Sequence, residues 1–302
     1  MRFSVWPNMD RSFEETLAVT KAAESYGWHA VYFADHFMPN GPDTTPLSGD
    51  VFESTTMLAA LAATTSTIRL GTLVAAATYR HPAVLAKSFA TLDNVSHGRA
   101  IVGLGAGWQE NEHDSYGIEL GSISRRIDRF SEYVQVVSSL LNQTTTNFHG
   151  EFYNLSAAPC EPRPVQSPMP LLLGVKGAKR TMAIAAQFAT QWNAWCSPDE
   201  MKSFGDVLDT HCSAIGRDPK SVEHTTQALL FLSHDETYLE PHRKSGGGSM
   251  IVGTPSEVVG IMEKYMAAGC DEFIVPAFTL GNKSRTLETL EMFNEEVVSA
   301  FR

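Results

Sequence analysis

Short apolar runs alternate with amphipathic segments along the whole 302-residue chain. A run of roughly four to eight apolar residues favours a buried strand, whereas apolar residues spaced three and four apart favour a helix. By these criteria the predicted strands are residues 3–7, 30–34, 68–76, 100–104, 171–174, 191–195, 222–232 and 272–276. The predicted helices are residues 12–27, 52–65, 82–94, 125–141, 177–188, 199–215, a segment that begins at Pro255, and 285–301.

This alternation of strands and helices predicts a parallel sheet, because parallel strands need a long crossover connection that a helix usually provides. Eight such units in a chain of this length are typical of a (β/α)8 TIM barrel. We see no internal repeat and no linker that would divide the chain. We therefore expect an α/β fold with a single domain over residues 1–302, a (β/α)8 barrel with insertion loops.

Composition limits the kinds of binding partner and the cellular compartment that we expect. Acidic residues outnumber basic ones, 34 against 23, for a net charge of −11. Nucleic acids and anionic membranes attract basic surfaces, so neither is expected as a partner. The four cysteines are far apart and form no Cys-x-x-Cys pair, which favours free thiols in a reducing cytoplasm. The N-terminus lacks the apolar core of a signal peptide, and no segment is long and apolar enough to span a membrane.

Polar and titratable residues gather after the predicted strands. In a (β/α)8 barrel the carboxyl ends of the strands meet at one mouth, where active sites lie. Asp35 and His36 follow the second strand, and Asn193 and Trp195 end the sixth. Histidine titrates near neutral pH, so His36 could act as an acid or base. The alternative is a buried histidine bonded to a backbone carbonyl.

Three glycines at alternate positions, Gly103, Gly105 and Gly107, interrupt the fourth strand. Alternate residues share one face of a strand, and glycine there often marks the close approach of a ligand or another backbone. Trp108 and a polar run, residues 109–114, follow at once. The pattern predicts the floor of a flat-ligand site, or else space for a large neighbouring side chain. It is not the G-x-G-x-x-G that opens a helix in dinucleotide-binding folds.

The turn after the fifth strand, residues 174–177, reads GVKG and leads into a helix. Backbone N–H groups and the positive end of a helix dipole make such a junction suitable for an anion. Lys176, Lys179 and Arg180 add positive charge. We expect phosphate binding here, the alternative being an ordinary helix start with a solvated basic turn.

The segment after Trp108 also contains Glu112, His113 and Asp114, which together suggest a metal site. Helical metal ligands are usually three or four residues apart, as in H-E-x-x-H, and this spacing is absent here. We therefore expect no metal.

Several segments together resemble the bacterial luciferase-like family of flavin- and deazaflavin-dependent oxidoreductases. They are YFADHFMPNG, LGTLVAAATYRHPAVLAK, HGRAIVGLGAGWQENEHDSYGI, and VGTPSEVV with AGCDEFIVP. The resemblance covers nearly the whole chain and is greatest to the branch that uses coenzyme F420. It implies a (β/α)8 barrel that binds a reduced flavin or deazaflavin across its mouth, in a protein that is by default a homodimer.

The resemblance also implies roles for single residues. Asp35 and His36 would face the cofactor ring and the substrate, with His36 as general acid/base and Asp35 fixing hydrogen bonds to the ring or cofactor. A non-proline cis peptide in the third strand would support the ring, and Leu73–Val74 is the candidate. The residues expected to bind the cofactor are Asp35, Leu73, Val74, Ala75, Ala106, Gly107, Gly174, Val175, Lys176, Gly177 and Ala178.

Two departures from the family pattern matter. Sugar-phosphate dehydrogenases of the family carry a glutamate directly after the G-x-G-x-G run, where this chain has Trp108. The difference argues against a sugar phosphate and toward a flatter or more apolar substrate, with Trp108 as an apolar wall. It leaves Glu110, Glu112 and His113 as candidates for the missing acid. The family's phosphate-binding turn is also richer in glycine than GVKGAKR.

Three functions are compatible with these residues. The first is hydride transfer between F420 and a small organic substrate. The second is an FMN-dependent monooxygenase of the same family; a basic groove would favour F420, but Arg80, Lys87 and Arg99 are too scattered to form one. The third is a non-catalytic flavin or F420 carrier, which would not need the titratable groups. The loops expected to shape the substrate pocket are residues 38–50, 148–170 and 233–249.

Overall fold

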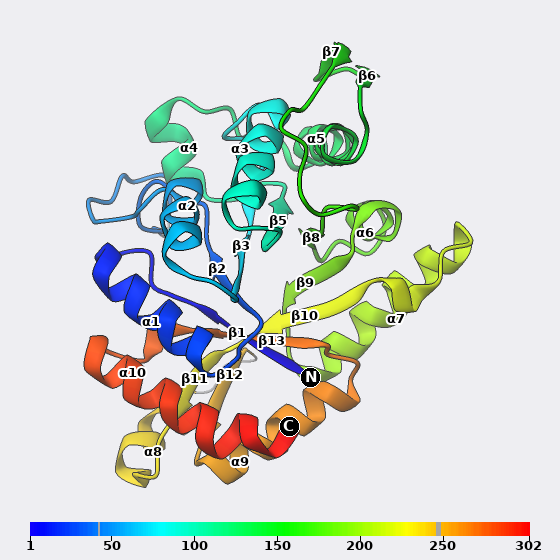
Figure 1. The fold of residues 1–302 in the computed structure, drawn as a ribbon. Helices are drawn as coiled ribbons and strands as arrows, with labels where there is room; N and C mark the ends of the chain where they lie inside the picture. Colours follow the sequence, from blue (N-terminus) through cyan, green and yellow to red (C-terminus); the bar gives the residue numbers. More distant parts are fainter. Residues whose placement is uncertain (42, 246–248) are drawn as a thin grey trace.

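The computed structural model describes residues 1–41, 43–245 and 249–302. Its main sheet is entirely parallel and closes into a barrel (Figure 1). Around the ring the strands are β1 (Arg2–Trp6), β2 (Ala30–Phe33), β3 (Arg69–Thr72) with β4 (Ala75–Ala76), β5 (Ala100–Gly105), β8 (Leu171–Gly174), β9 (Gln191–Trp195), β10 (Glu223–Gln227) and β13 (Glu272–Pro276). β13 pairs with β1, and β3 pairs with both β2 and β5, so the ring is continuous. The predicted (β/α)8 barrel is confirmed.

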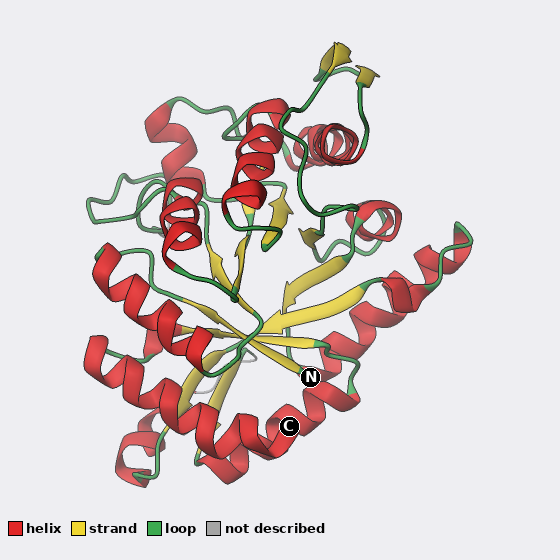
Figure 2. Cartoon of the chain, in the orientation of Figure 1, coloured by secondary structure: helices red, strands yellow, loops and turns green. Residues whose placement is uncertain are grey.

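Helices surround the strands, as Figure 2 shows. Those that follow barrel strands are α1 (Phe13–Ser25), α2 (Ser54–Thr64), α3 (Pro82–Val95), α5 (Ile123–Asn142), α6 (Thr181–Phe188), α7 (Pro198–Ala214) and α10 (Lys283–Met292). Helix α9 (Pro255–Ala267) lies between the barrel strands β10 and β13. Local sequence fixes several starts: the Ser12 side chain accepts from the Glu15 N–H, and Ser197 with Glu200 forms a capping box. Such caps satisfy N–H groups that have no partner within the helix.

The third strand differs from the prediction. In place of one strand over residues 68–76, β3 ends at Thr72 and β4 begins at Ala75. The peptide between Leu73 and Val74 is cis, which confirms the bond that the family resemblance implied. β3 pairs with the start of β5 and β4 with its end, so the interruption keeps the ring intact.

The seventh predicted strand is also divided. Residues 222–232 form β10, which belongs to the barrel, and β11 (Leu229–Leu232), which pairs with β12 (Met250–Gly253) in a separate small sheet. Residues 233–249, expected to be irregular, contain helix α8 (Glu236–Ser245).

Two further segments differ from the prediction. The polar segment after Trp108, which is not among the predicted helices, forms a short helix, α4 (Glu110–Tyr116). The last helix is α10, which ends at Met292 and continues as π-helical and 3-10 turns to Phe301. Within the insertion after α5, β6 (Thr146–His149) and β7 (Asn154–Ala158) form an antiparallel hairpin.

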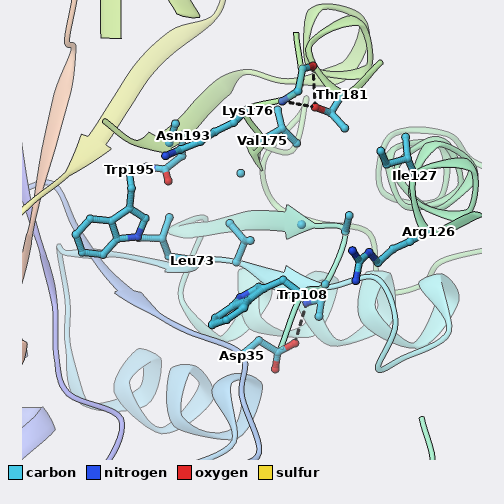
Figure 3. A pocket seen from close by; sticks show the side chains of 18 of the residues that line it. Asp35, Leu73, Trp108, Arg126, Ile127, Val175, Lys176, Thr181, Asn193 and Trp195 are labelled. Atoms are coloured by element: carbon cyan, nitrogen blue, oxygen red, sulfur yellow. Dashed lines mark hydrogen bonds between the residues drawn. The ribbon is translucent and has the colours of Figure 1, made fainter. Parts of the chain in front are cut away.

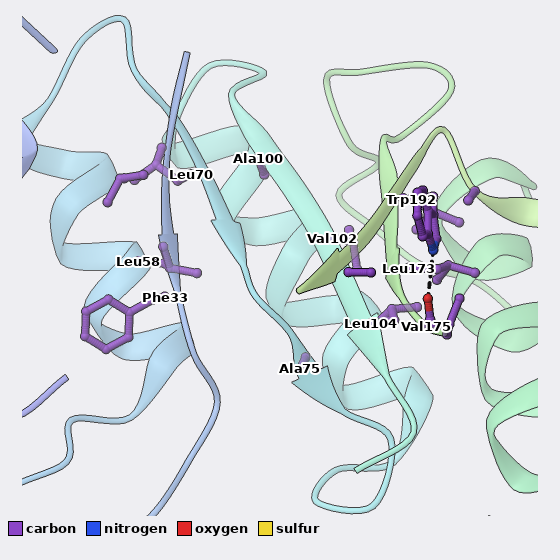
Figure 4. Close-up of a cluster of buried hydrophobic side chains, with 14 of the residues drawn as sticks. Phe33, Leu58, Leu70, Ala75, Ala100, Val102, Leu104, Leu173, Val175 and Trp192 are labelled. Carbon is purple, nitrogen blue, oxygen red and sulfur yellow. Dashed lines mark hydrogen bonds between the residues drawn. The ribbon is translucent and has the colours of Figure 1, made fainter. Parts of the chain in front are cut away.

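Successive strand residues point alternately into the barrel and outward toward the helices. Tyr32 belongs to the small cluster inside the barrel, and its neighbour Phe33 belongs to the large cluster between barrel and helices. Figure 4 shows part of the large cluster, where Leu58 of α2 and Leu104 of β5 are among the buried side chains. Within the described ranges, no helix has the length and apolarity needed to cross a lipid bilayer.

Candidate active site

A cavity of about 520 Å³ opens at the carboxyl ends of the barrel strands (Figure 3). It falls within the range of small-molecule sites, and it lies where barrels of this kind bind their ligands. Its lining residues are Trp6, Asp35, His36, Leu73, Val74, Ala76, Tyr79, Gly105, Ala106, Gly107, Trp108, Ile123, Arg126, Ile127, Gly174, Val175, Lys176, Gly177, Thr181, Asn193, Ala194, Trp195 and Gln227.

Most residues predicted to bind the cofactor therefore lie together. Ala75 and Ala178 are the two that do not line the cavity. The prediction for the loops was wrong: no described residue of 38–50, 148–170 or 233–249 lines it. The first of these loops packs on the segment around α4, where its carbonyl groups accept hydrogen bonds from Gln109 and Asn111.

Val74 occupies the space left by the strand glycines. A Cβ atom at Gly105 would lie 2.5 Å from Val74 Cγ2, and one at Gly174 would lie 3.0 Å from its Cγ1. At Gly103 a Cβ would lie 1.8 Å from the carbonyl oxygen of Thr72. These glycines are therefore needed for the close approach of the third strand. Because glycines stand at positions 105 and 174, Val74 fits beside their backbone and lines the cavity.

His36 is held by Glu112 of α4. Its Nδ1 lies 2.7 Å from Oε1 of Glu112, whose side chain is completely buried. The Tyr79 hydroxyl donates to the same oxygen, and the N–H of Phe37 donates to Oε2 at 2.7 Å. Burial alone would raise the pKa of Glu112, but hydrogen bonds from these three donors outweigh it and hold the pKa below its usual value.

The second nitrogen of His36, Nε2, is the one left for a ligand. Nδ1 is engaged by Glu112, and no described residue bonds to Nε2. His36 lines the cavity and packs edge-on against Trp108, with 5.6 Å between ring centroids. Trp108 is itself 57% exposed, so its indole forms an outer wall of the mouth. Nε2 of His36 can therefore donate or accept one proton at a fixed position beside the apolar indole of Trp108.

Asp35 is buried and already has four donors. Arg80 binds it through both terminal nitrogens at 2.6 and 2.9 Å, Ser54 donates to Oδ1 at 2.7 Å, and the N–H of Ala76 donates to Oδ2 at 3.1 Å. The same arginine pairs with Glu53, the N-cap residue of α2. The Asp35 carboxylate therefore orders β4 and the start of α2.

Three consecutive residues after β4 connect these groups, and the sequence analysis missed their role. Thr78 accepts from or donates to His113, Tyr79 donates to Glu112, and Arg80 binds Asp35. The available signal was a polar tripeptide at the carboxyl end of a barrel strand. Through these contacts residues 78–80, which follow β4, hold the end of β2 and helix α4 against the third strand.

Among the three candidates for the missing acid, the structure brings only Glu112 to His36. His113 is buried, with Nδ1 2.6 Å from the carbonyl oxygen of Gln109 and Nε2 2.7 Å from Thr78 Oγ1. Both ring nitrogens are therefore engaged away from the cavity, and burial lowers its pKa. Glu110 is exposed on α4 and does not line the cavity.

The turn after β8 is less open to an anion than the sequence suggested. The N–H of Gly177 donates to Thr181 Oγ1 at 3.0 Å, and Arg180 pairs with Asp128 on α5. Helix α6 begins only at Thr181. Lys176 lines the cavity and is exposed.

Arg126 is a cavity residue that the sequence analysis did not single out. It lies on α5 with Ile123 and Ile127, on the face toward the cavity, at the opposite end from Trp195 in Figure 3. Among the described residues nothing forms a hydrogen bond or ion pair with its side chain. Burial, and then repulsion from Arg129, lowers its pKa. A bound anion would raise this pKa again, because an opposite charge favours the charged guanidinium.

Comparison with known proteins gives the following relationships. The family model for luciferase-like monooxygenases matches residues 1–244. An uncharacterized protein of Mycobacterium tuberculosis is 32% identical over 213 residues, 67% of this chain and 74% of that protein. The pyrimidine monooxygenase RutA of Allorhizobium ampelinum is 36% identical over 183 residues, 59% of this chain and 48% of that one. The F420-dependent glucose-6-phosphate dehydrogenase of Kineococcus radiotolerans is 36% identical over 156 residues, 51% and 44% of the two chains.

Solved structures show the same fold. The coenzyme F420-dependent tetrahydromethanopterin reductase from Methanopyrus kandleri aligns with 100% of this chain and 99% of its own, with a TM-score of 0.83 and 19% identity. The monooxygenase RslO1 from Streptomyces bottropensis aligns over 100% of both chains, with a TM-score of 0.84 and 22% identity.

Proposed function

Because the chain belongs to the luciferase-like monooxygenase family, we propose that it is an oxidoreductase that transfers a hydride between coenzyme F420 and a small organic substrate at the barrel mouth. One relative that supports this cofactor is named as an F420-dependent dehydrogenase, although the chain aligns with less than half of its length. The observation that carries the proposal is the histidine held at the cavity wall. Hydride transfer to or from a carbon–oxygen bond needs a group that gives or takes a proton at the oxygen.

The described residues suit a planar cofactor with an anionic side chain. Leu73 and Val74 offer an apolar surface, and Gly105 and Gly174 line the cavity beside them. The unpaired Arg126 would hold the anionic side chain, together with the turn that follows β8. The deazaflavin supplies the hydride chemistry when it is bound, and the protein supplies position and proton transfer.

His36 would move the proton. Glu112, whose lowered pKa keeps it ionised, accepts from Nδ1–H and so fixes both the ring orientation and the tautomer. In the reductive direction the protonated ring would donate from Nε2 to the substrate oxygen, and in the oxidative direction Nε2 would accept that proton. Asp35 would act as a positioning residue, because its oxygens are already bonded to Arg80, Ser54 and Ala76.

Trp108 would keep water away from the reacting atoms. Its indole packs against His36 at the mouth and is more than half exposed, so a bound substrate would cover it. Removal of water strengthens the electrostatic interactions of a site and prevents leakage of protons.

The experiment that tests the proposal is a fluorescence titration of the apo-protein with F420 and, separately, with FMN. Saturable F420 binding with much weaker FMN binding supports hydride transfer and justifies a substrate screen with reduced F420. The reverse preference would replace the proposal with an FMN-dependent monooxygenase, and one relative, RutA, is named as a pyrimidine monooxygenase. Binding of neither cofactor contradicts the proposal, and F420 binding without turnover of any substrate would favour a carrier.

A further inference from the structure

The cavity has an end opposite to Arg126 that the proposed cofactor contacts do not use. Trp195 and Asn193, both from β9, lie there in Figure 3. Trp6 from β1 and Gln227 from β10 also line the cavity, and the Trp6 and Trp195 ring centroids are 6.0 Å apart. Trp6 packs edge-on against Phe278 at 4.8 Å, which fixes its plane. The walls of this end are thus aromatic and rigid.

Two carboxamides form the polar part of this end. Asn193 is 4% exposed and Gln227 is 1% exposed, so both are almost fully buried. Their orientations follow from a chain of hydrogen bonds that starts at Thr225. The Thr225 hydroxyl donates to the carbonyl oxygen of Trp192 at 3.0 Å, so toward Asn193 it can only accept. The group that faces it at 2.8 Å must therefore be Nδ2 of Asn193.

The second hydrogen of that nitrogen goes to Gln227 Oε1, also at 2.8 Å. This contact leaves Oδ1 of Asn193 and Nε2 of Gln227 without a partner among the described residues. Neither atom is enclosed by protein, whereas the indole nitrogen of Trp6 is buried and unpaired. Because both carboxamides line the cavity, a free acceptor and a free donor remain open to a ligand.

We propose that this end, formed by Trp6, Trp195, Asn193 and Gln227, is a substrate subsite for a planar, uncharged molecule with a cis-amide edge, such as a lactam or imide. The ligand N–H would donate to Asn193 Oδ1, and the ligand carbonyl would accept from Gln227 Nε2. Trp6 and Trp195, whose rings contact each other at 50°, would together offer one aromatic surface for the ligand plane. Buried polar groups of this kind select strongly, because a ligand that lacks the matching edge leaves them unpaired.

This inference rests on the proposed function, because it takes the remainder of the cavity to be the cofactor site. A pyrimidinedione ring within a flavin or deazaflavin has an amide edge of its own, so the same chemistry could come from the cofactor. The two sources differ in one observable. A substrate subsite can be occupied together with F420, whereas a ring subsite cannot.

The test uses the full chain and three bicyclic probes of the same shape. 2-Quinolone carries the N–H and the adjacent carbonyl, 1-methyl-2-quinolone lacks the donor, and quinoline lacks the carbonyl. We expect 2-quinolone to bind at least about tenfold more tightly than either analogue, in calorimetric or saturation-transfer NMR titrations. Equal affinity of the three probes would overturn the inference. So would exclusion of 2-quinolone by saturating F420.

Substitutions test the same contact from the protein side. Gln227→Glu keeps an acceptor for Asn193 and removes the free donor, and Gln227→Met removes both polar atoms at similar length. Each should weaken 2-quinolone binding about tenfold or more and leave quinoline binding unchanged. Gln143→Glu makes the same chemical change at an exposed position that does not line the cavity, and it should have no effect. Unchanged 2-quinolone affinity in a folded Gln227 variant would contradict the proposal.

F420 titration of the same proteins separates the two hypotheses. If F420 binds while 2-quinolone shows no preference over its analogues, the substrate subsite is wrong and the cofactor proposal stands. If F420 does not bind but 2-quinolone binds with dependence on Gln227, the cofactor proposal fails and the amide subsite stands.

Discussion

The two ends of the barrel each bury a glutamate beside a histidine, and the two glutamates behave in opposite ways. At the mouth, Glu112 has three hydrogen-bond donors and a lowered pKa. At the floor, Glu272 at the start of β13 accepts from Ser4 at 2.5 Å, while its Oε2 has no hydrogen-bond partner among the described residues. Burial raises the pKa of Glu272 and outweighs the opposing effects of Ser4, the more distant Arg2 and the Tyr32 hydroxyl.

The difference teaches that the number of donors, and not burial itself, decides whether an interior carboxylate stays ionised. Both glutamate side chains are fully buried. Glu112 lies 2.7 Å from His36, which lines the cavity at the mouth, whereas Glu272 lies 3.9 Å from His29, which does not line that cavity. We therefore assign the mouth to chemistry and the floor to stability, and the following substitutions test that division.

The largest effect is expected at His36. His36→Ala removes the proton-transfer group and should lower turnover by about 10²–10⁴-fold, without changing F420 affinity or the free energy of unfolding by much. The measurement is steady-state oxidation of reduced F420 with a substrate found by screening. His149→Ala, an exposed histidine on β6, is the matched control. Unchanged turnover in His36→Ala would show that the assignment is wrong.

A smaller loss is expected at Glu112. Glu112→Gln turns an acceptor of three hydrogen bonds into a group with its own N–H donors, so one or more buried donors lose their partner. Turnover should fall roughly 5- to 150-fold through the misplaced His36 ring, and the free energy of unfolding should fall by about 1–3 kcal/mol. Because Glu112 acts through His36, kcat should change and the F420 dissociation constant should not. A change confined to that dissociation constant would contradict the positioning role.

At the floor, His29 should control stability in acid. Burial, and then repulsion from Arg2 and Arg69, lowers its pKa to about 4. Between about pH 6.5 and pH 4 the unfolded chain binds a proton that the folded protein does not, so stability is complete above pH 6.5 and falls with decreasing pH, by about 3 kcal/mol at most. His29→Asn should flatten this dependence in urea unfolding measured from pH 4.5 to 7.5. Turnover should not change, and an equally steep profile in the variant would refute the assignment.

The smallest effect is expected at Glu272. A raised pKa means that its contribution to stability is present below the unfolded value of about 4.5 and is lost as pH rises through the folded value. Glu272→Gln cannot ionise, so relative to the native protein it should gain stability with rising pH, on the order of 1 kcal/mol. Urea unfolding at pH 5 and pH 8 measures the difference. A variant that loses activity at the mouth would contradict the division between the two ends.

For the fold, the sequence was sufficient wherever the signal was local. Apolar runs identified the strands, and apolar residues spaced three and four apart identified the helices, because burial periodicity depends on neighbours in sequence. The interruption after Thr72 was not visible in the apolar pattern, since residues 73–76 are as apolar as a continuous strand. The separate pairing of β11 with β12 was hidden for the same reason: strand partners are decided by tertiary contacts.

For the site, the sequence by itself determined which residues meet at the mouth, because barrel geometry brings the carboxyl ends of the strands together. It placed His36, Leu73, Val74 and Trp108 correctly at one mouth. Only the tertiary structure decided which titratable groups meet: Glu112 reaches His36, while its sequence neighbour His113 turns away toward Thr78. Adjacent residues on a helix point about 100° apart, so the partner of each is set by the packing of α4 and not by its position in the chain.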